Sequence, residues 1–88
     1  MAWVYVLRGP SGRHYIGSTT DLAHRLEQHR RGHTHSTRRL GQPLELVASL
    51  ELESLAEARS LEREMKRKKN PRLALFLLEL RRQAITQR

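Results

Sequence analysis

Hydrophobic and polar positions along the chain predict two short strands, a helix, a third strand and two further helices. The β-branched and aromatic run WVYVL at 3–7 is typical of a strand, and RHYIGS at 13–18 follows as a second one. The turn residues RGPSG at 8–12 separate them, and this connection is too short for a crossover. We therefore expect the two strands to pair as an antiparallel hairpin.

The first helix is expected to begin near residue 22 and to run to about Arg31. Thr19, Thr20 and Asp21 offer an N-cap and a first-turn carboxylate, and Gly32 can end the helix. The polar and basic segment 33–42 then has the composition of a loop. PLELVASLEL at 43–52 predicts a third strand, although its alternation is imperfect.

Two more helices are expected in the last third of the chain. Ser54 can cap a long helix that runs to about Lys69. Asn70 is a good N-cap and Pro71 a good first helical residue, so the chain restarts there as a leucine-rich helix that continues to about Ile85.

This order of elements, β-β-α-β-α-α, predicts the fold class. We expect an α/β (α+β) fold in which a small three-stranded antiparallel-type sheet is flanked by helices. The 88 residues suit one domain, 1–88. The chain has no cysteine, which excludes disulfides and thiolate metal sites. No apolar run approaches the ~20 residues that cross a bilayer, and no signal-peptide pattern begins the chain, so a cytoplasmic protein without a membrane partner is the default expectation.

Charge points to a polyanionic partner. The sequence has 17 Lys and Arg against 9 Asp and Glu, a net charge of +8. Such an excess favours nucleic acid through phosphate contacts and counterion release. A basic protein that is merely soluble has the same composition, so the charge alone leaves both interpretations open.

The first predicted helix carries polar residues at the edge of its apolar side. With about 100° per residue from Leu22, Leu26 falls near 40°, and His29 and Arg25 fall near −20° and −60°. They are four residues apart and share a face. Arg25 could lay its stem on the core with its head in water, and His29 could be a half-buried, hydrogen-bonded residue. Equally, both could be aimed at a groove beside the sheet.

The long helix repeats this arrangement with an acid. Ala58, Leu61 and Met65 form its apolar stripe, and Glu62 lies beside that stripe. Taken alone, Glu62 is explained by an ion pair with Lys66 one turn later.

The predicted hairpin contributes two tyrosines. Tyr5 shares one face of the first strand with Trp3 and Leu7, and Tyr15 shares a face of the second with Gly17. Gly17 weakens a strand interior unless another group approaches its backbone closely. A core tyrosine with a satisfied hydroxyl is the ordinary interpretation of each ring.

Taken together, "VY" in the first strand, "YIG" in the second, "RLEQH" in the next helix and "ARSLEREMKR" in a later one resemble the GIY-YIG nuclease superfamily. The similarity is to small single-domain bacterial members, to the nuclease domain of bacterial excision-repair nucleases and to related structure-specific nucleases. It spans the chain from Trp3 to about Leu80. The first half-motif departs from the pattern, because it is WVY and keeps only the tyrosine.

The resemblance implies a set of site residues. Those matching catalytic positions are Tyr5, Tyr15, Arg25, His29 and Glu62, with Gly17 structural at the site and Glu62 holding one Mg²⁺ or Mn²⁺ ion. Thr37 and Arg38 resemble the "TR" of the family's basic loop, and Lys66 falls where this subgroup often has a lysine. We expect contacts to nucleic-acid phosphates from Thr37, Arg38, Arg39, Lys66, Arg67, Lys68 and Lys69.

The chemistry of phosphodiester hydrolysis matches these residue types. Arg25 stays protonated and forks onto phosphate oxygens, and a single carboxylate such as Glu62 is a usual Mg²⁺ ligand beside a phosphate. Positive charge can turn a tyrosine into a base, and we favour Tyr15 as that base, with Tyr5 positioning the water and His29 relaying the proton. We expect a metal-dependent endonuclease acting on DNA, structure-specific and linked to DNA repair or recombination. A non-catalytic basic module that binds nucleic acid is the alternative.

The last helix is more apolar than one buried face requires. Leu73, Phe76, Leu77 and Leu80 form a stripe, and Leu75 and Leu78 fall outside it. Either the helix is sandwiched, or it exposes a patch for a protein partner or a homodimer.

Overall fold

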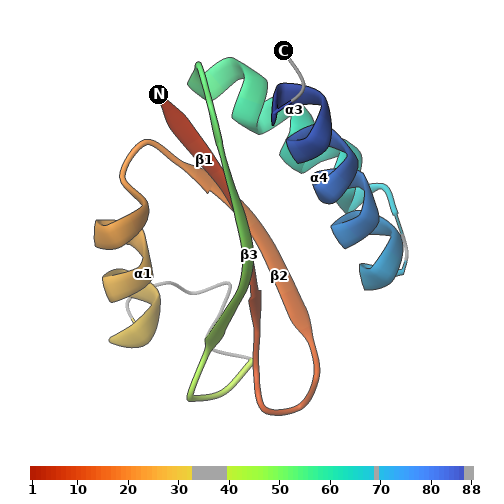
Figure 1. Ribbon diagram of the computed structural model, residues 1–88. Coiled ribbons are helices and arrows are strands. Elements are labelled where there is room, and N and C mark those ends of the chain that lie inside the picture. Colours follow the sequence, from red (N-terminus) through yellow and green to blue (C-terminus); the bar gives the residue numbers. More distant parts are fainter. Residues whose placement is uncertain (33–39, 69, 87–88) are drawn as a thin grey trace.

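The computed structural model describes residues 1–32, 40–68 and 70–86. Its elements are β1 (Ala2–Arg8), β2 (His14–Thr19), α1 (Leu22–Arg30), β3 (Glu45–Leu52), α3 (Leu55–Lys66) and α4 (Pro71–Thr86), and Figure 1 shows their arrangement. The predicted order β-β-α-β-α-α and the α/β (α+β) class are confirmed. No helix in the described part of the chain is both long enough and apolar enough to cross a membrane.

The sheet has the order β2-β1-β3, and both of its pairings are antiparallel. Tyr5 in the central strand lies opposite Gly17 of β2 and Ser49 of β3. The register against β3 shifts between Val6 and Leu7. This irregularity explains the imperfect alternation of the third strand, because an extra residue in one strand moves the following side chains to the other face.

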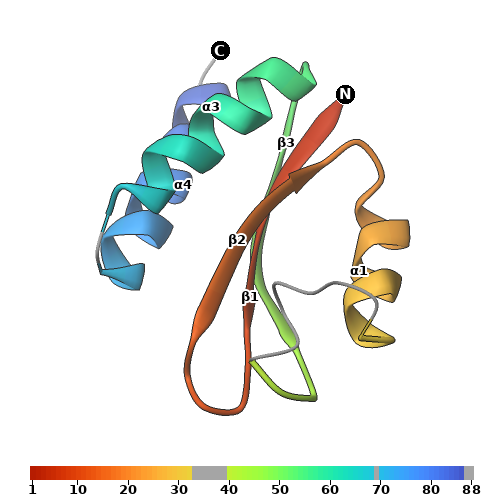
Figure 2. The same cartoon turned by 180° about the vertical axis from the view of Figure 1, so that it is seen from behind.

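Helices cover both faces of this sheet. Figures 1 and 2 show α1 against one face, and α3 and α4 packed side by side against the other. The strand β2 is an outer strand of the sheet, so its free edge lies between the two helical layers. Side chains from the two faces of the sheet can therefore meet around this edge.

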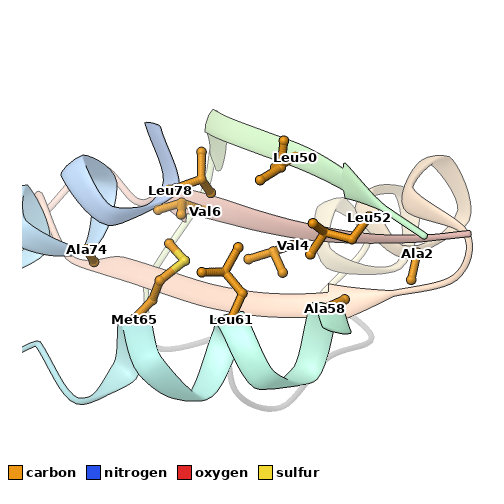
Figure 3. Packing of buried hydrophobic residues seen from close by; sticks show 10 residues of the cluster. All are labelled: Ala2, Val4, Val6, Leu50, Leu52, Ala58, Leu61, Met65, Ala74 and Leu78. Atoms are coloured by element: carbon orange, nitrogen blue, oxygen red, sulfur yellow. The ribbon is translucent and has the colours of Figure 1, made fainter. Parts of the chain in front are cut away.

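The hydrophobic core lies between the sheet and the pair α3 and α4 (Figure 3). The predicted stripe of α3 is confirmed, because Ala58, Leu61 and Met65 are fully buried there. Val4 and Val6 of β1 face the same core, so Tyr5 between them points to the opposite face, toward α1.

Side-chain caps begin the helices where the sequence predicts them. The carboxylate of Asp21 accepts from the backbone N–H of His24 at 3.1 Å, and the hydroxyl of Ser54 accepts from that of Glu57 at 3.1 Å. The Oδ1 atom of Asn70 accepts from the N–H of Arg72 at 2.9 Å. The long helix α3 ends at Lys66, three residues before the predicted end.

The last helix presents most of its predicted stripe to solvent, whereas Leu77 is partly buried against the core. Leu73, Phe76 and Leu80 are 53%, 62% and 47% exposed, whereas Ala74 and Leu78 are buried in the core. Of the two arrangements left open by the sequence, the exposed patch is the one present. The buried face was not obvious in advance, because small Ala74 is a weak hydrophobic signal.

Candidate active site

Three rings gather between the sheet and α1. The ring centroids of Tyr5 and Tyr15 lie 6.2 Å apart, and that of His29 lies 5.6 Å from Tyr5 and 5.3 Å from Tyr15. The Tyr5 hydroxyl and the Nε2 atom of His29 are hydrogen-bonded at 2.8 Å. Both residues are buried, His29 with only 1% of its surface exposed. The helical wheel placed His29 at the stripe's edge, but it is the one buried residue of α1.

Gly17 makes this cluster possible. A Cβ atom at this position would lie 2.5 Å from the Tyr5 hydroxyl oxygen and 3.0 Å from a ring carbon of Tyr15. Any side chain at residue 17 would therefore displace the phenol. A glycine within a strand predicts that another group lies close to its backbone, and at Gly17 these groups are the two tyrosine rings.

Arg25 lies one turn before His29 on α1. Its Nη1 atom donates to the side-chain oxygen of Gln28 at 3.2 Å, and its guanidinium also interacts with the phenol of Tyr5. The Nε atom of Arg25 is buried and has no hydrogen-bond partner among residues 1–32, 40–68 and 70–86. A buried N–H without a partner is unusual in proteins, and a small shift of the partly buried Arg25 side chain would let it donate to an anionic oxygen.

Burial keeps the tyrosine–histidine pair neutral. Burial raises the pKa of Tyr5 to about 12, and the nearby guanidinium of Arg25 offsets only part of that effect. Burial also lowers the pKa of His29, and the positive charge of Arg25 lowers it further. Since Arg25 can only donate to the phenol oxygen, we assign the Tyr5 hydroxyl as the donor to Nε2 of His29.

Glu62 lies on the other side of β2. Its carboxylate accepts a hydrogen bond from the hydroxyl of Ser18 and pairs with the ammonium of Lys66 at 2.7 Å. The Glu62 side chain is 20% exposed. The ion pair with Lys66 that the helix spacing predicts for Glu62 is thus present. Ser18 adds a contact from β2, the strand that also carries Tyr15 and Gly17.

Lys66 connects the two sides around the edge of β2. Its Nζ atom pairs with Glu62 and lies 6.0 Å from the centroid of the Tyr15 ring. The carboxylate and the tyrosine are therefore within reach of one ammonium group, although Tyr15 and Ser18 point to opposite faces of their strand.

A shallow cavity of about 360 Å³ opens at Glu62. Ser18 and Lys66 line it together with two arginines of α3, Arg59 and Arg63. Neither Ser18 nor these two arginines are among the site residues predicted from the sequence. Part of this grouping is visible in the spacing, because Arg59 lies three residues before Glu62 and four before Arg63, and residues at these spacings are neighbours on a helix.

The oxygen atoms around Glu62 are suited to one hard divalent cation whose remaining ligands include a phosphate. Among the described residues no group of three or more His, Asp or Glu could hold a metal by themselves. Mg²⁺ is commonly held by one or two carboxylates, with water and substrate phosphate completing its shell. Glu62 and the Ser18 hydroxyl are oxygen donors of this kind, and the surrounding cations suit the phosphate.

The expected phosphate-contact residues are only partly described. Thr37, Arg38, Arg39 and Lys69 lie outside the described residues. Lys66, Arg67 and Lys68 are exposed at the end of α3. These three cations therefore lie at the same end of the helix as the site.

Comparisons with known proteins agree with this architecture. The family model of the GIY-YIG catalytic domain matches residues 1–74. UPF0213 proteins from Streptococcus pneumoniae serotype 4 and strain R6 are each 40% identical to this chain over 78 residues, which is 89% of this chain and 79% of theirs. The solution NMR structure of a UPF0213 protein from Bacillus halodurans is similar, with 33% identity, a TM-score of 0.55 and coverage of 91% of this chain and 85% of the other.

Proposed function

Because this chain belongs to the GIY-YIG family, we propose that it is a divalent-metal-dependent endonuclease that hydrolyses phosphodiester bonds in DNA. One observation carries the proposal: the ammonium of Lys66 pairs with the carboxylate of Glu62 and lies over the ring of Tyr15. A candidate metal-binding acid and a candidate base, 47 residues apart in the chain, are thus linked through one ammonium group, and Lys66 lines the cavity beside each of them.

Arg25 is the group that holds the phosphate on the α1 side. Its guanidinium stays protonated at any pH the protein meets, and its buried Nε–H has no protein acceptor in the described part of the chain, so it is left to donate to a phosphate once the side chain shifts toward the substrate. Such a donor stabilises the negative charge that grows on the phosphoryl oxygens during attack.

Tyr15 is the base that accepts the proton of the attacking water, and Tyr5 is a positioning group. Tyr5 is buried, and its proton is held in the hydrogen bond to His29. Tyr15 is only partly buried and lines an open cavity together with Lys66. Tyr15 would act in its phenolate form, which becomes neutral as it takes the proton of the water, and the ammonium of Lys66 over its ring favours that anionic form before the step. His29 accepts the proton of Tyr5 in its hydrogen bond and is in edge contact with both rings, so it would hold the two phenols in place while Tyr15 releases its proton to water.

Glu62 would hold the metal ion. When bound there, the ion polarises a phosphoryl oxygen and supports the departing alkoxide. The hydroxyl of Ser18 fixes one carboxylate oxygen, so the acid keeps one orientation. The ion pair with Lys66 holds the other oxygen, and Lys66 can turn instead to a phosphate, since it is an exposed and flexible cation.

Cationic side chains along α3 would bind the DNA backbone. Arg59 and Arg63 border the cavity at Glu62, and Arg67 and Lys68 follow at the end of α3. Cations of this kind bind backbone phosphates without regard to sequence, and binding weakens steeply with salt. A preference for branched or damaged DNA, and a role in repair or recombination, belong to the same proposal.

Plasmid nicking tests the proposal. Supercoiled DNA is incubated with the protein in Mg²⁺, in Mn²⁺ and in EDTA, and the product is resolved on a gel; a panel of duplex, flap, branched and single-stranded oligonucleotides follows. We expect cleavage with either metal and none in EDTA. Binding without cleavage under all conditions would favour the alternative, a non-catalytic nucleic-acid-binding module.

A second candidate concerns the exposed face of α4. Leu73, Phe76 and Leu80 form an apolar patch that a protein partner or a second copy could cover. We propose it as an interaction surface that works alongside the nuclease site. Light scattering at high concentration distinguishes the two, because a mass of one chain excludes a second copy and leaves a different protein as the partner. The Phe76→Glu variant places a charge in the patch and should weaken any such association.

A further inference from the structure

A second cavity lies next to the candidate active site. It has a volume of about 310 Å³ and opens between β2 and the junction of α3 with α4. Tyr15 and Lys66 line it, and Lys66 also lines the cavity at Glu62. Since ligand sites span about 300–1,000 Å³, this volume suits a single small ring system and its substituents.

The floor of this cavity is apolar. Val6, Ile16 and Ala74 line it, and Val6 and Ala74 are also part of the hydrophobic core (Figure 3). An ion such as phosphate gains nothing from an apolar floor, because burying charge there costs hydration. A flat and largely apolar group is the better occupant.

The wall carries a polar atom that lacks a partner. His14 lines the cavity, and its Nδ1 atom is buried without a hydrogen bond to any of the residues that the structure describes. Buried polar atoms in proteins are nearly always paired. The ring of His14 is only partly buried, so by turning toward the cavity it could pair this atom with an occupant that has donors or acceptors at its edge as well as apolar faces.

The rim carries positive charge. Lys66 and Lys68 line the opening, so an occupant with anionic neighbours is favoured. A nucleobase in a DNA strand meets all of these requirements, because its ring has apolar faces and a polar edge and its nucleotide has a phosphate on either side.

We propose that this cavity binds one unpaired nucleobase of the strand that is cut. The inference rests on the proposed function and names a feature of its substrate. Since Tyr15 borders both the candidate active site and the cavity, the base belongs to a nucleotide next to the cleaved bond. A base in a regular duplex is stacked and paired, so a bulge, flap or single strand enters the cavity at the least cost.

A binding experiment in EDTA tests this without cleavage. The first duplex carries a single bulged 2-aminopurine, and the second carries an abasic residue at the same place. We expect the wild type to bind the first about tenfold more tightly, which lies within the range that stacking of one base contributes. The fluorescence of 2-aminopurine reports whether the base moves.

His14→Leu is the informative variant, and His24→Leu, an exposed histidine on α1, is its control. We expect His14→Leu to remove the preference for the base while the affinity for fully paired duplex stays unchanged. His24→Leu should keep the preference. Equal affinity of the wild type for the two bulged duplexes, or an undiminished preference in His14→Leu, would overturn the inference.

A measurement on the wild type covers the case in which His14→Leu does not fold. The methyl NMR signals of Ile16 and Ala74 should shift with the 2-aminopurine bulge and stay in place with the abasic one. Unchanged signals with both would overturn the inference. If the protein cleaves DNA in Mg²⁺ but binds both bulged duplexes equally, only this inference is wrong. If it prefers the 2-aminopurine bulge but does not cleave DNA, only the proposed endonuclease activity is wrong.

Discussion

The hydroxyl of Tyr5 is hydrogen-bonded to Nε2 of His29 at 2.8 Å inside the molecule, although the two residues are 24 positions apart. The bond joins the central strand to α1, and α1 has no other fully buried side chain. It also fixes the direction of the imidazole toward Tyr15. This neutral pair therefore contributes both to the stability of the fold and to the chemistry proposed for it.

Stability should decline below neutral pH. The folded chain keeps His29 neutral, because its pKa lies below the ordinary value of 6.5. Below pH 6.5 the unfolded chain binds a proton on this residue and the folded chain does not, so stability is complete above 6.5 and declines as the pH falls toward the folded pKa. Urea unfolding at pH 7, 6 and 5 should show this decline.

His29→Gln should have a smaller loss of stability between pH 7 and pH 5 than the wild type. His24→Gln is the matched control on the same helix, since His24 is exposed, and it should behave like the wild type. A pH dependence that is identical in His29→Gln and the wild type would show that this imidazole is not held neutral.

The two tyrosines should respond differently to loss of their hydroxyls. Tyr15→Phe removes the proposed base, so cleavage should fall by about 10²–10⁴-fold with little change in stability. Tyr5→Phe leaves Nε2 of His29 without its partner, which should cost about 1–3 kcal/mol of unfolding free energy. Its effect on cleavage should be smaller. A larger catalytic loss in Tyr5→Phe than in Tyr15→Phe would reverse the assigned roles.

Gly17→Ala tests how tightly the site is packed. The added methyl would lie 2.5 Å from the Tyr5 hydroxyl oxygen, so the phenol must move. We expect a loss of about 1–3 kcal/mol in the free energy of unfolding and slower cleavage. Thermal unfolding and the NMR signals of the His29 ring measure the two effects. A variant as stable and as active as the wild type would mean that the phenol has room to shift.

Most of the fold follows from local patterns in the sequence. Caps at Asp21, Ser54 and Asn70 mark the helix starts, and the stripe of α3 is buried as periodicity predicts. The buried face of α4 does not follow, because the wheel ranks its large leucines above Ala74. Burial of Ala74 depends on the close packing of α4 against α3, which no single helix reveals.

The candidate site likewise has residues that the sequence predicts and features that depend on tertiary contacts. Spacing and resemblance select the tyrosines, Arg25, His29 and Glu62, yet a helix taken alone makes His29 a residue of the stripe's edge. Its complete burial depends on the hydroxyl of Tyr5, which comes from a strand. Ser18 was missed for a related reason, since its contact with Glu62 exists only after α3 packs on β2.

Ser18→Ala tests whether that contact orients the acid. Removing a group that orients a metal ligand weakens metal affinity by about 10–100-fold, so the Mg²⁺ concentration for half-maximal cleavage should rise by a factor in this range. The rate at saturating Mg²⁺ should change less. Ser60→Ala, at an exposed position of α3, is the control. An unchanged Mg²⁺ requirement in Ser18→Ala would remove Ser18 from the account.

Glu62→Gln tests the central claim most directly, because it replaces the carboxylate that we propose to hold the metal by an amide of the same shape. Glu64→Gln makes the same change two residues away, at an exposed position of α3. Cleavage of a DNA substrate in Mg²⁺ is measured for both variants and the wild type, with thermal unfolding and DNA binding in EDTA alongside. We predict that Glu62→Gln loses cleavage while it folds and binds DNA, and that Glu64→Gln cleaves like the wild type. Cleavage by Glu62→Gln at the wild-type rate would contradict the account.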